Sequence, residues 1–123
     1  MDILSNLLWM EILTASEAWQ ARVRARLDQA HVEQRRLMVH QQIAIDLLSN
    51  TARRRALLKS ARAEVRRWSE LQLCSPDYIE RWSAWLELPV PQLVASMCST
   101  SGAWAPAVRQ NSPFTAVARR PES

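Results

Sequence analysis

Apolar positions repeat with a helical period along most of this chain. Between Val23 and Leu48 they are spaced alternately by four and three residues, which is the heptad rhythm of packed helices. Two alanines and two glutamines stand in this seam, so it favours an intramolecular helical hairpin over a strong dimeric zipper. The complete seam is Val23, Leu27, Ala30, Gln34, Leu37, Gln41, Ala44 and Leu48.

The pattern changes phase after the seam ends. The change coincides with Ser49–Thr51, three residues that favour caps and turns. We expect a helix–helix turn there, with Asn50 in the left-handed conformation. Two antiparallel helices would then cover residues 15 (or 3) to 48 and 51 to about 73. The second helix has its own apolar stripe, formed by Leu57, Leu58, Ala61, Val65, Trp68 and Leu71.

The N-terminal segment Ile3–Leu13 is apolar on more than one side, which is typical of a helix that is buried or lies in an interface. Thr14–Glu17 matches a capping box, which marks a new helix start. A kink, or a helix that continues unchanged, is also open, since Thr and Ser are tolerated within helices. The length of the first helix leaves its start without a partner, and either the C-terminal segment or a second subunit must cover it. The candidate interface residues are Leu4, Leu8, Trp9, Ile12 and Trp104.

The C-terminal third consists of short, Trp-rich helices, which we expect to pack on the longer arm of the hairpin. Ser75, Pro76 and Asp77 mark a helix start, and this helix extends to about Leu88. A second short helix covers residues 91–99, a turn or two surrounds Trp104, and Phe114 is a plausible anchor. Residues 115–123 read as a disordered tail. We therefore expect one domain over 1–114.

Composition supports an all-α fold and excludes several chemistries. The first 75 residues contain neither proline nor glycine, and no segment keeps the alternation of a strand. The only glycine is Gly102, so a phosphate-cradling loop cannot be built. His31 and His40 lie on opposite sides of one helix, are read as surface residues, and cannot share a metal. We predict a protein that is not an enzyme and needs no cofactor or metal.

Positive charge is concentrated on the second long helix. Residues 51–75 carry seven Lys and Arg side chains against two Glu, whereas the rest of the chain is close to neutral. Four of the cations form one stripe of about 16 Å. Three interpretations of this stripe are open. It binds an acidic protein surface, it binds nucleic-acid phosphates, or it only keeps the helix soluble. The stripe is Arg55, Lys59, Arg62 and Arg66, and the flanking cations are Arg53, Arg54 and Arg67.

Several features favour a cytoplasmic protein without a membrane partner. Cys74 and Cys98 lack the spacing of a metal site, and we expect no disulfide. Asp2 stands where a secretion signal carries positive charge. The apolar run Ile3–Leu13 is too short to cross a bilayer.

The run Leu73–Ile79, followed by Trp82, Leu86, Trp104 and Arg109–Phe114, resembles small helical accessory proteins of bacterial mobile genetic elements. The resemblance covers residues 51–114 and has no catalytic motif. It implies a cytoplasmic accessory protein without a defined activity. The leading hypothesis is a non-enzymatic interaction protein, an accessory or inhibitory factor with a protein partner. One alternative is a nucleic-acid-binding regulator that uses the same stripe, and another is a self-assembling structural protein, for example a homodimer.

Overall fold

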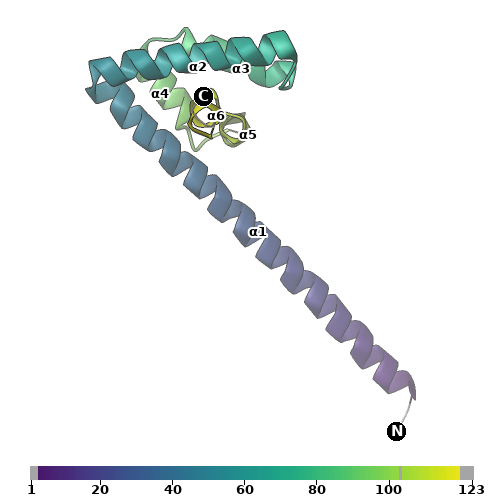
Figure 1. Ribbon diagram of the computed structural model, residues 1–123. Helices are drawn as coiled ribbons and strands as arrows, with labels where there is room; N and C mark the ends of the chain where they lie inside the picture. The colour runs from purple at the N-terminus through teal and green to yellow at the C-terminus, as the bar shows by residue number, and fades with distance from the viewer. Residues whose placement is uncertain (1–2, 103, 120–123) are drawn as a thin grey trace. The chain divides into compact units, whose positions relative to one another are not determined.

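The computed structural model describes the backbone of residues 3–102 and 104–119 and the side chains of residues 10–12, 14–102 and 104–116. All regular elements in these ranges are helices, which confirms the predicted all-α class (Figure 1). They are α1 (Ile3–Ser49), α2 (Thr51–Leu71), α3 (Pro76–Leu86), α4 (Val90–Met97), α5 (Trp104–Gln110) and α6 (Pro113–Arg119). The sequence predicts one domain over 1–114, whereas the structure divides into two compact units, Met1–Gln34 and Arg35–Ser123.

The first unit contains the N-terminal part of α1. The helix passes through the capping-box match without interruption. The Thr14 hydroxyl does not cap a new helix, but donates to the Met10 carbonyl oxygen at 2.8 Å within the same helix. Among the described side chains of residues 10–34, only Val23 and Val32 are even half-buried. The described side chains of this unit are therefore largely exposed.

Asn50 separates α1 from α2, so the break falls within the predicted turn. The conformation predicted for Asn50 was wrong: its backbone is extended, with φ −131° and ψ 109°. Its side-chain oxygen accepts from the Arg53 backbone N–H at 3.0 Å and caps α2. An N-cap residue has extended φ and ψ. Asn50 is therefore extended as the N-cap of α2, and not left-handed as predicted.

The left-handed residue is Gln72, at the C-terminal end of α2, with φ 52° and ψ 46°. The backbone N–H groups of Gln72 and Leu73 both donate to the Trp68 carbonyl oxygen and close the helix. Leu71 lies in this last turn and is exposed, so its place in the buried stripe of α2 was wrong. The chain leaves α2 here before any other element covers that position.

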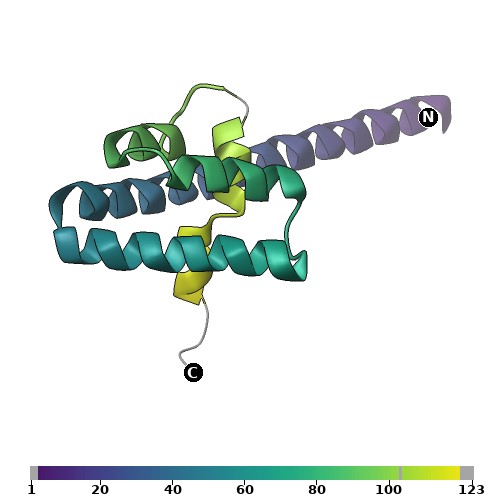
Figure 2. The same cartoon turned by 90° about the horizontal axis from the view of Figure 1, so that it is seen from above.

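The second unit is organised around Trp82 of α3, which is fully buried. Helix α3 runs back along α2, and α6 packs on another side of α2 (Figure 2). The Trp82 ring meets Trp85 and Phe114 edge to face, at centroid separations of 5.2 and 5.8 Å. The core is completed by Ala44, Leu47, Ala61, Val65, Trp68, Leu86, Leu93, Met97 and Val108.

The last turns of α1 face this core with His40, Ala44 and Leu47. The predicted seam was therefore rotated, since its members Gln41 and Leu48 are exposed. The reason is that α2 packs mainly on α3 and α6, and not lengthwise on α1. The C-terminal helices therefore pack mainly on α2, the shorter arm of the predicted hairpin, and not on the longer arm as the sequence predicted.

The predicted disordered tail was wrong for residues 115–119, which belong to α6. Pro113 begins the helix, and the Ser112 hydroxyl accepts from the Phe114 backbone N–H at 3.3 Å. Phe114 is buried against α3 and Ala116 packs at the core, so tertiary contacts stabilise the helix. The prediction for residues 120–123 lies outside the described residues.

Candidate functional site

The strongest candidate site is the basic face of α2, defined as Arg55, Lys59, Arg62 and Arg66. The helical period places these residues on one side, because they follow one another at intervals of four, three and four residues. All four are exposed, whereas Ala61, Glu64, Val65 and Trp68 turn the opposite side of the helix into the core. The predicted separation of a charged and an apolar side is present in the fold.

The flanking cations are engaged within the molecule. Arg53 Nε lies 3.0 Å from Asp46 Oδ2, and Arg67 Nη2 lies 3.0 Å from Glu64 Oε1. Arg54 donates to the last carbonyl groups of α1, those of Leu47 and Leu48. These three arginines hold helix ends and a buried carboxylate, so their positive charge is partly neutralised locally.

The basic face itself keeps its charge. Arg62 Nη2 donates to the Leu86 carbonyl oxygen at 3.1 Å, which orients its guanidinium at the end of α3. In the described part of the chain, Arg55, Lys59 and Arg66 have no hydrogen-bonded or ion-paired partner. Three unneutralised cations on one helical face are able to attract an anionic surface.

Two shallow hollows flank Arg62 on this face and give it apolar patches between the cations. Leu58 lies in the first hollow, and Val65, Ile79 and Leu86 lie in the second. The first is lined by Thr51, Arg54, Arg55, Leu58, Lys59 and Arg62. The second is lined by Arg62, Val65, Arg66, Ser69, Ile79, Ser83, Leu86 and Glu87. Charged and aliphatic groups of a partner would therefore both find contacts.

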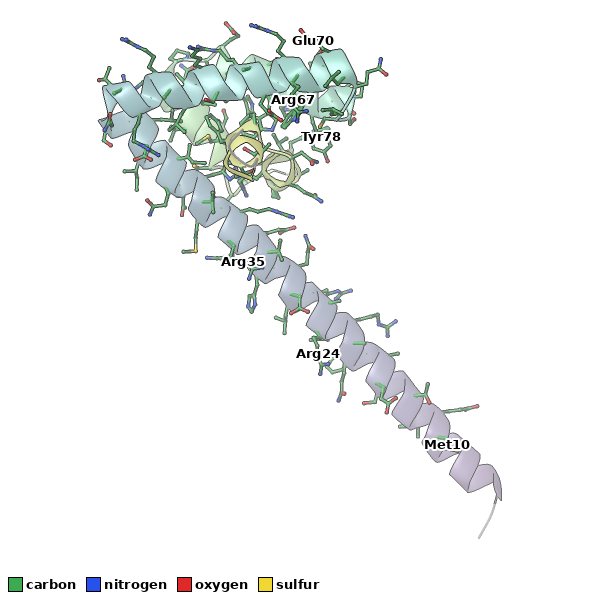
Figure 3. All side chains as sticks on the ribbon, in the orientation of Figure 1. Met10, Arg24, Arg35, Arg67, Glu70 and Tyr78 are labelled. Atoms are coloured by element: carbon green, nitrogen blue, oxygen red, sulfur yellow. The ribbon has the colours of Figure 1, made fainter. Side chains whose placement is uncertain are left out.

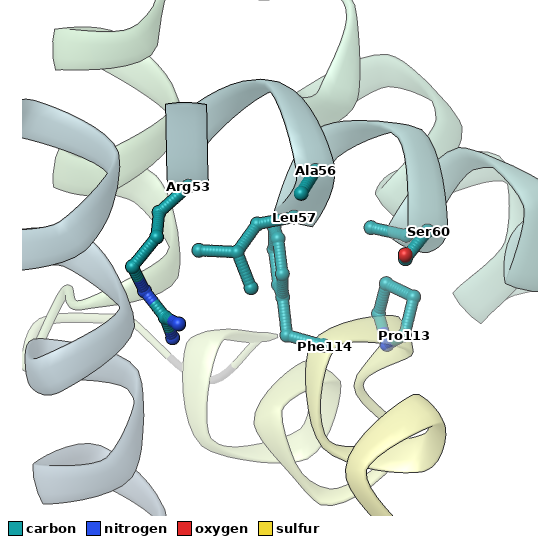
Figure 4. A pocket seen from close by; sticks show the side chains of 7 residues that line it. Arg53, Ala56, Leu57, Ser60, Pro113 and Phe114 are labelled. Carbon is teal, nitrogen blue, oxygen red and sulfur yellow. The ribbon is translucent and has the colours of Figure 1, made fainter. Parts of the chain in front are cut away.

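A third hollow opens between α2 and α6 and is mainly apolar (Figure 4). Its only charged side chain is Arg53, which already pairs with Asp46. Leu57 and Phe114 form its apolar wall, and Ser60 supplies a hydroxyl group. Its lining is a packing surface that carries one hydroxyl group and one paired guanidinium group.

Sequence reasoning missed the burial of four polar residues, which are His40, Glu64, Arg109 and Ser112. Glu64 Oε1 accepts from Trp68 Nε1 at 2.9 Å, and this carboxylate also binds Arg67. The i, i+3 and i, i+4 spacing of the three residues was the available signal. His40 was read as a surface residue and is fully buried, with Nε2 at 2.8 Å from Ser112 Oγ and Nδ1 at 2.6 Å from the Arg36 carbonyl oxygen.

The residues near His40 in the sequence could not predict this burial, because its partner Ser112 lies 72 residues away along the chain. Burial lowers the pKa of the imidazole from its ordinary value of 6.5 and outweighs the hydrogen bond to the Arg36 carbonyl oxygen, which raises it. The nearby Arg109 cation adds a smaller lowering. Neutral His40 therefore bridges α1 and the start of α6 at neutral pH. His31, in contrast, is exposed as predicted.

This geometry predicts acid sensitivity. Because the folded pKa of His40 is lower than the unfolded one, the unfolded chain binds more protons as the pH falls below 6.5. The free energy of unfolding should decrease over that range by at most about 1.4 kcal/mol per pH unit. Urea unfolding at several pH values measures the slope, and His40→Gln should flatten it. His31→Gln is the control, and equal slopes for both variants would contradict the prediction.

The predicted interface residues belong to different units or have side chains outside the described residues. Ile12 is 59% exposed in the first unit, whereas Trp104 belongs to the second unit and is 46% exposed. The Arg81 guanidinium carbon lies 4.3 Å from the centroid of the Trp104 ring, so one ring face is covered. The side chains of Leu4, Leu8 and Trp9 lie outside the described residues.

Cys74 and Cys98 are free, and burial raises the pKa of both thiols, which favours the unreactive protonated form. Within the described ranges, no cluster of His, Cys, Asp and Glu side chains has the arrangement needed to hold a metal ion. The same ranges contain no helix with the length and apolar character required to span a bilayer.

No protein-family model, curated protein or solved structure matches this chain.

Proposed function

We propose that this chain is a non-enzymatic binding protein whose basic face on α2 contacts an acidic surface of a protein partner. The observation that carries the proposal is the contrast between two sets of cations. Arg53 and Arg67 are paired within the molecule, whereas the described contacts of Arg55, Lys59 and Arg66 include no counter-charge. An anionic partner would supply the negative charge that these three cations lack among the described residues.

The hollows beside Arg62 favour a protein partner. Leu58 on one side of Arg62, and Val65 and Ile79 on the other, offer contacts to aliphatic groups. A helix that carries both carboxylates and apolar side chains would satisfy the cations and the hollows together. A phosphate backbone would satisfy the cations alone.

Nucleic acid is the second candidate, because the cations form a line. Arg55 and Arg66 are eleven residues apart, which corresponds to about 16 Å along the helix axis. Lys59 and Arg62 lie between them on the same face. Such a line is able to contact successive phosphates without reading bases.

The proposed biological role is that of an accessory or inhibitory factor of a bacterial mobile genetic element. The segment that resembles such proteins, residues 51–114, includes the whole basic face. A protein of this kind acts by occupying a surface on its partner, and it needs no chemistry of its own.

Reversing three of the unneutralised charges tests the proposal. The variant R55E/K59E/R66E should weaken binding about 100-fold, since each lost or reversed contact costs on the order of 1 kcal/mol. Capture from bacterial lysate, with and without nuclease, identifies the bound species, and titration with the purified partner measures Kd.

The control variant R22E/R26E/R35E makes the same change in net charge at exposed positions of α1. Nuclease-resistant capture that survives in the control and is lost in R55E/K59E/R66E supports a protein partner. Equal capture by both variants would remove the basic face from the proposal.

A retardation assay with a 30-base-pair duplex at about 50 mM salt tests the second candidate. Binding that weakens steeply with salt, with a smaller salt dependence for R55E/K59E/R66E, would favour nucleic acid over protein. No retardation at that salt concentration would eliminate it.

A further inference from the structure

The first unit presents an apolar stripe that its own residues leave uncovered. Ile12, Trp19 and Leu27 are 59%, 61% and 56% exposed, and half-buried Val23 lies between them. At 100° per residue, these four residues fall within about 80° of the helix circumference. The stripe is defined as these four residues.

A helix with such a stripe is normally stabilised by a partner. Most helical stability in proteins comes from packing an apolar face against another element. Three large apolar side chains more than half exposed on one face are typical of an interaction surface. The Trp19 ring alone offers an area that would dominate a small interface.

The charges along α1 indicate which partner fits. Residues 3–20 contain Glu11 and Glu17 and no Lys or Arg, whereas residues 21–27 contain Arg22, Arg24 and Arg26 and no acid. Met10 and Arg24 mark the two segments on the helix (Figure 3). Two copies aligned in parallel would place the three arginines of one beside those of the other. Two antiparallel copies would place each acidic segment beside an arginine segment.

We propose that the apolar stripe binds the same stripe of a second copy of this chain, with the two helices antiparallel. Glu17 and Arg24 are seven residues apart and therefore lie on the same flank of the helix. If the two-fold axis passes near residues 20 and 21, Glu17 of each copy lies opposite Arg24 of the other. Trp19 then packs near Val23 of the second copy. Two-fold symmetry forms each contact twice.

This pairing is independent of the basic face and requires nothing of α2. Sedimentation equilibrium of the full chain, from about 1 to 100 µM, should show a monomer–dimer equilibrium. Trp19→Ala should shift it toward monomer. Each single reversal, E17R or R24E, turns two attractive pairs into two repulsive ones and should raise the dimer Kd about tenfold.

The double variant E17R/R24E restores opposite charges across the antiparallel pair and should recover the wild-type Kd to within about threefold. E70R and R35E are the matched controls, because they make the same charge changes at exposed positions outside residues 3–27 and should leave Kd unchanged. Circular dichroism of each variant verifies that the helix forms.

A wild-type chain that stays monomeric at 100 µM would overturn the proposal. If the dimer Kd is not recovered in E17R/R24E, the antiparallel arrangement is overturned. If the control variants raise the dimer Kd as much as E17R or R24E does, the effect is one of general charge and the specific Glu17–Arg24 contact is overturned.

Discussion

Replacing Trp82 by alanine should lower the free energy of unfolding of the second unit by about 4 kcal/mol, the usual cost of truncating a buried tryptophan. The ring is fully buried and contacts Trp85 and Phe114 edge to face. Its Nε1–H donates to the carbonyl oxygens of Val108 and Asn111, at 3.1 and 2.8 Å. The substitution therefore removes packing volume and a shared hydrogen bond at the point where α3, α5 and α6 meet.

Urea unfolding followed by circular dichroism measures this change. Trp82→Phe keeps most of the apolar volume and loses the hydrogen bond, so it should cost about half as much. Trp104→Ala is the matched control, because that ring is 46% exposed and should cost about 1 kcal/mol or less. Equal losses for Trp82→Ala and Trp104→Ala would show that the core is not organised around Trp82.

Removing the carboxylate of Glu64 should have the second-largest effect. Glu64 is buried and accepts hydrogen bonds from Trp68 Nε1 at 2.9 Å and from Arg67 Nη2 at 3.0 Å. In Glu64→Ala, the buried Trp68 N–H loses this acceptor and Arg67 loses its ion pair. We expect a loss of about 3 kcal/mol, because a buried donor without a partner pays its full desolvation cost.

The isosteric Glu64→Gln keeps an oxygen acceptor for the indole N–H and should cost about 1 kcal/mol. Glu70→Ala removes an exposed carboxylate from the same helix and should change stability by less than about 0.5 kcal/mol. Chemical unfolding of the three variants gives the comparison. If Glu64→Ala and Glu70→Ala were equally stable, the Trp68 hydrogen bond would contribute nothing to the fold.

Local chemistry was sufficient to predict most helix boundaries. Asn50 caps α2 through its own side chain, and Pro76 begins α3 because its fixed φ suits the first helical position. The buried side chains Trp82, Leu86 and Leu93 also follow from helical spacing within single short segments. In each case the residues that determine the feature are close neighbours in the chain.

The basic face of α2 was predictable for the same reason. Arg55, Lys59, Arg62 and Arg66 share a side of the helix by spacing alone, and all four are exposed. Which cations are neutralised was not predictable. The Arg53–Asp46 pair spans a helix break, and the bond from Arg62 to the Leu86 carbonyl oxygen joins two helices, so both depend on how those helices pack.

Three errors share one physical origin. His40 was expected at the surface, Leu48 in a buried seam and residues 115–119 in a disordered tail. The fold instead places His40 against Ser112, rotates Leu48 outward and packs α6 on α2. A helical pattern shows that a residue belongs to a face, and only the neighbouring elements decide which face becomes the interior.

The amino-acid sequence by itself therefore determined the all-α class, the break at Asn50, the start of α3 and the cationic side of α2, because these depend on backbone propensity and on spacing within one helix. The tertiary structure alone decided the burial of His40 and Glu64, the ordering of α6 by Phe114 and the neutralisation of the flanking arginines. These features arise from contacts between separate elements. Such contacts form, and stabilise the fold, only when the second unit has assembled around Trp82.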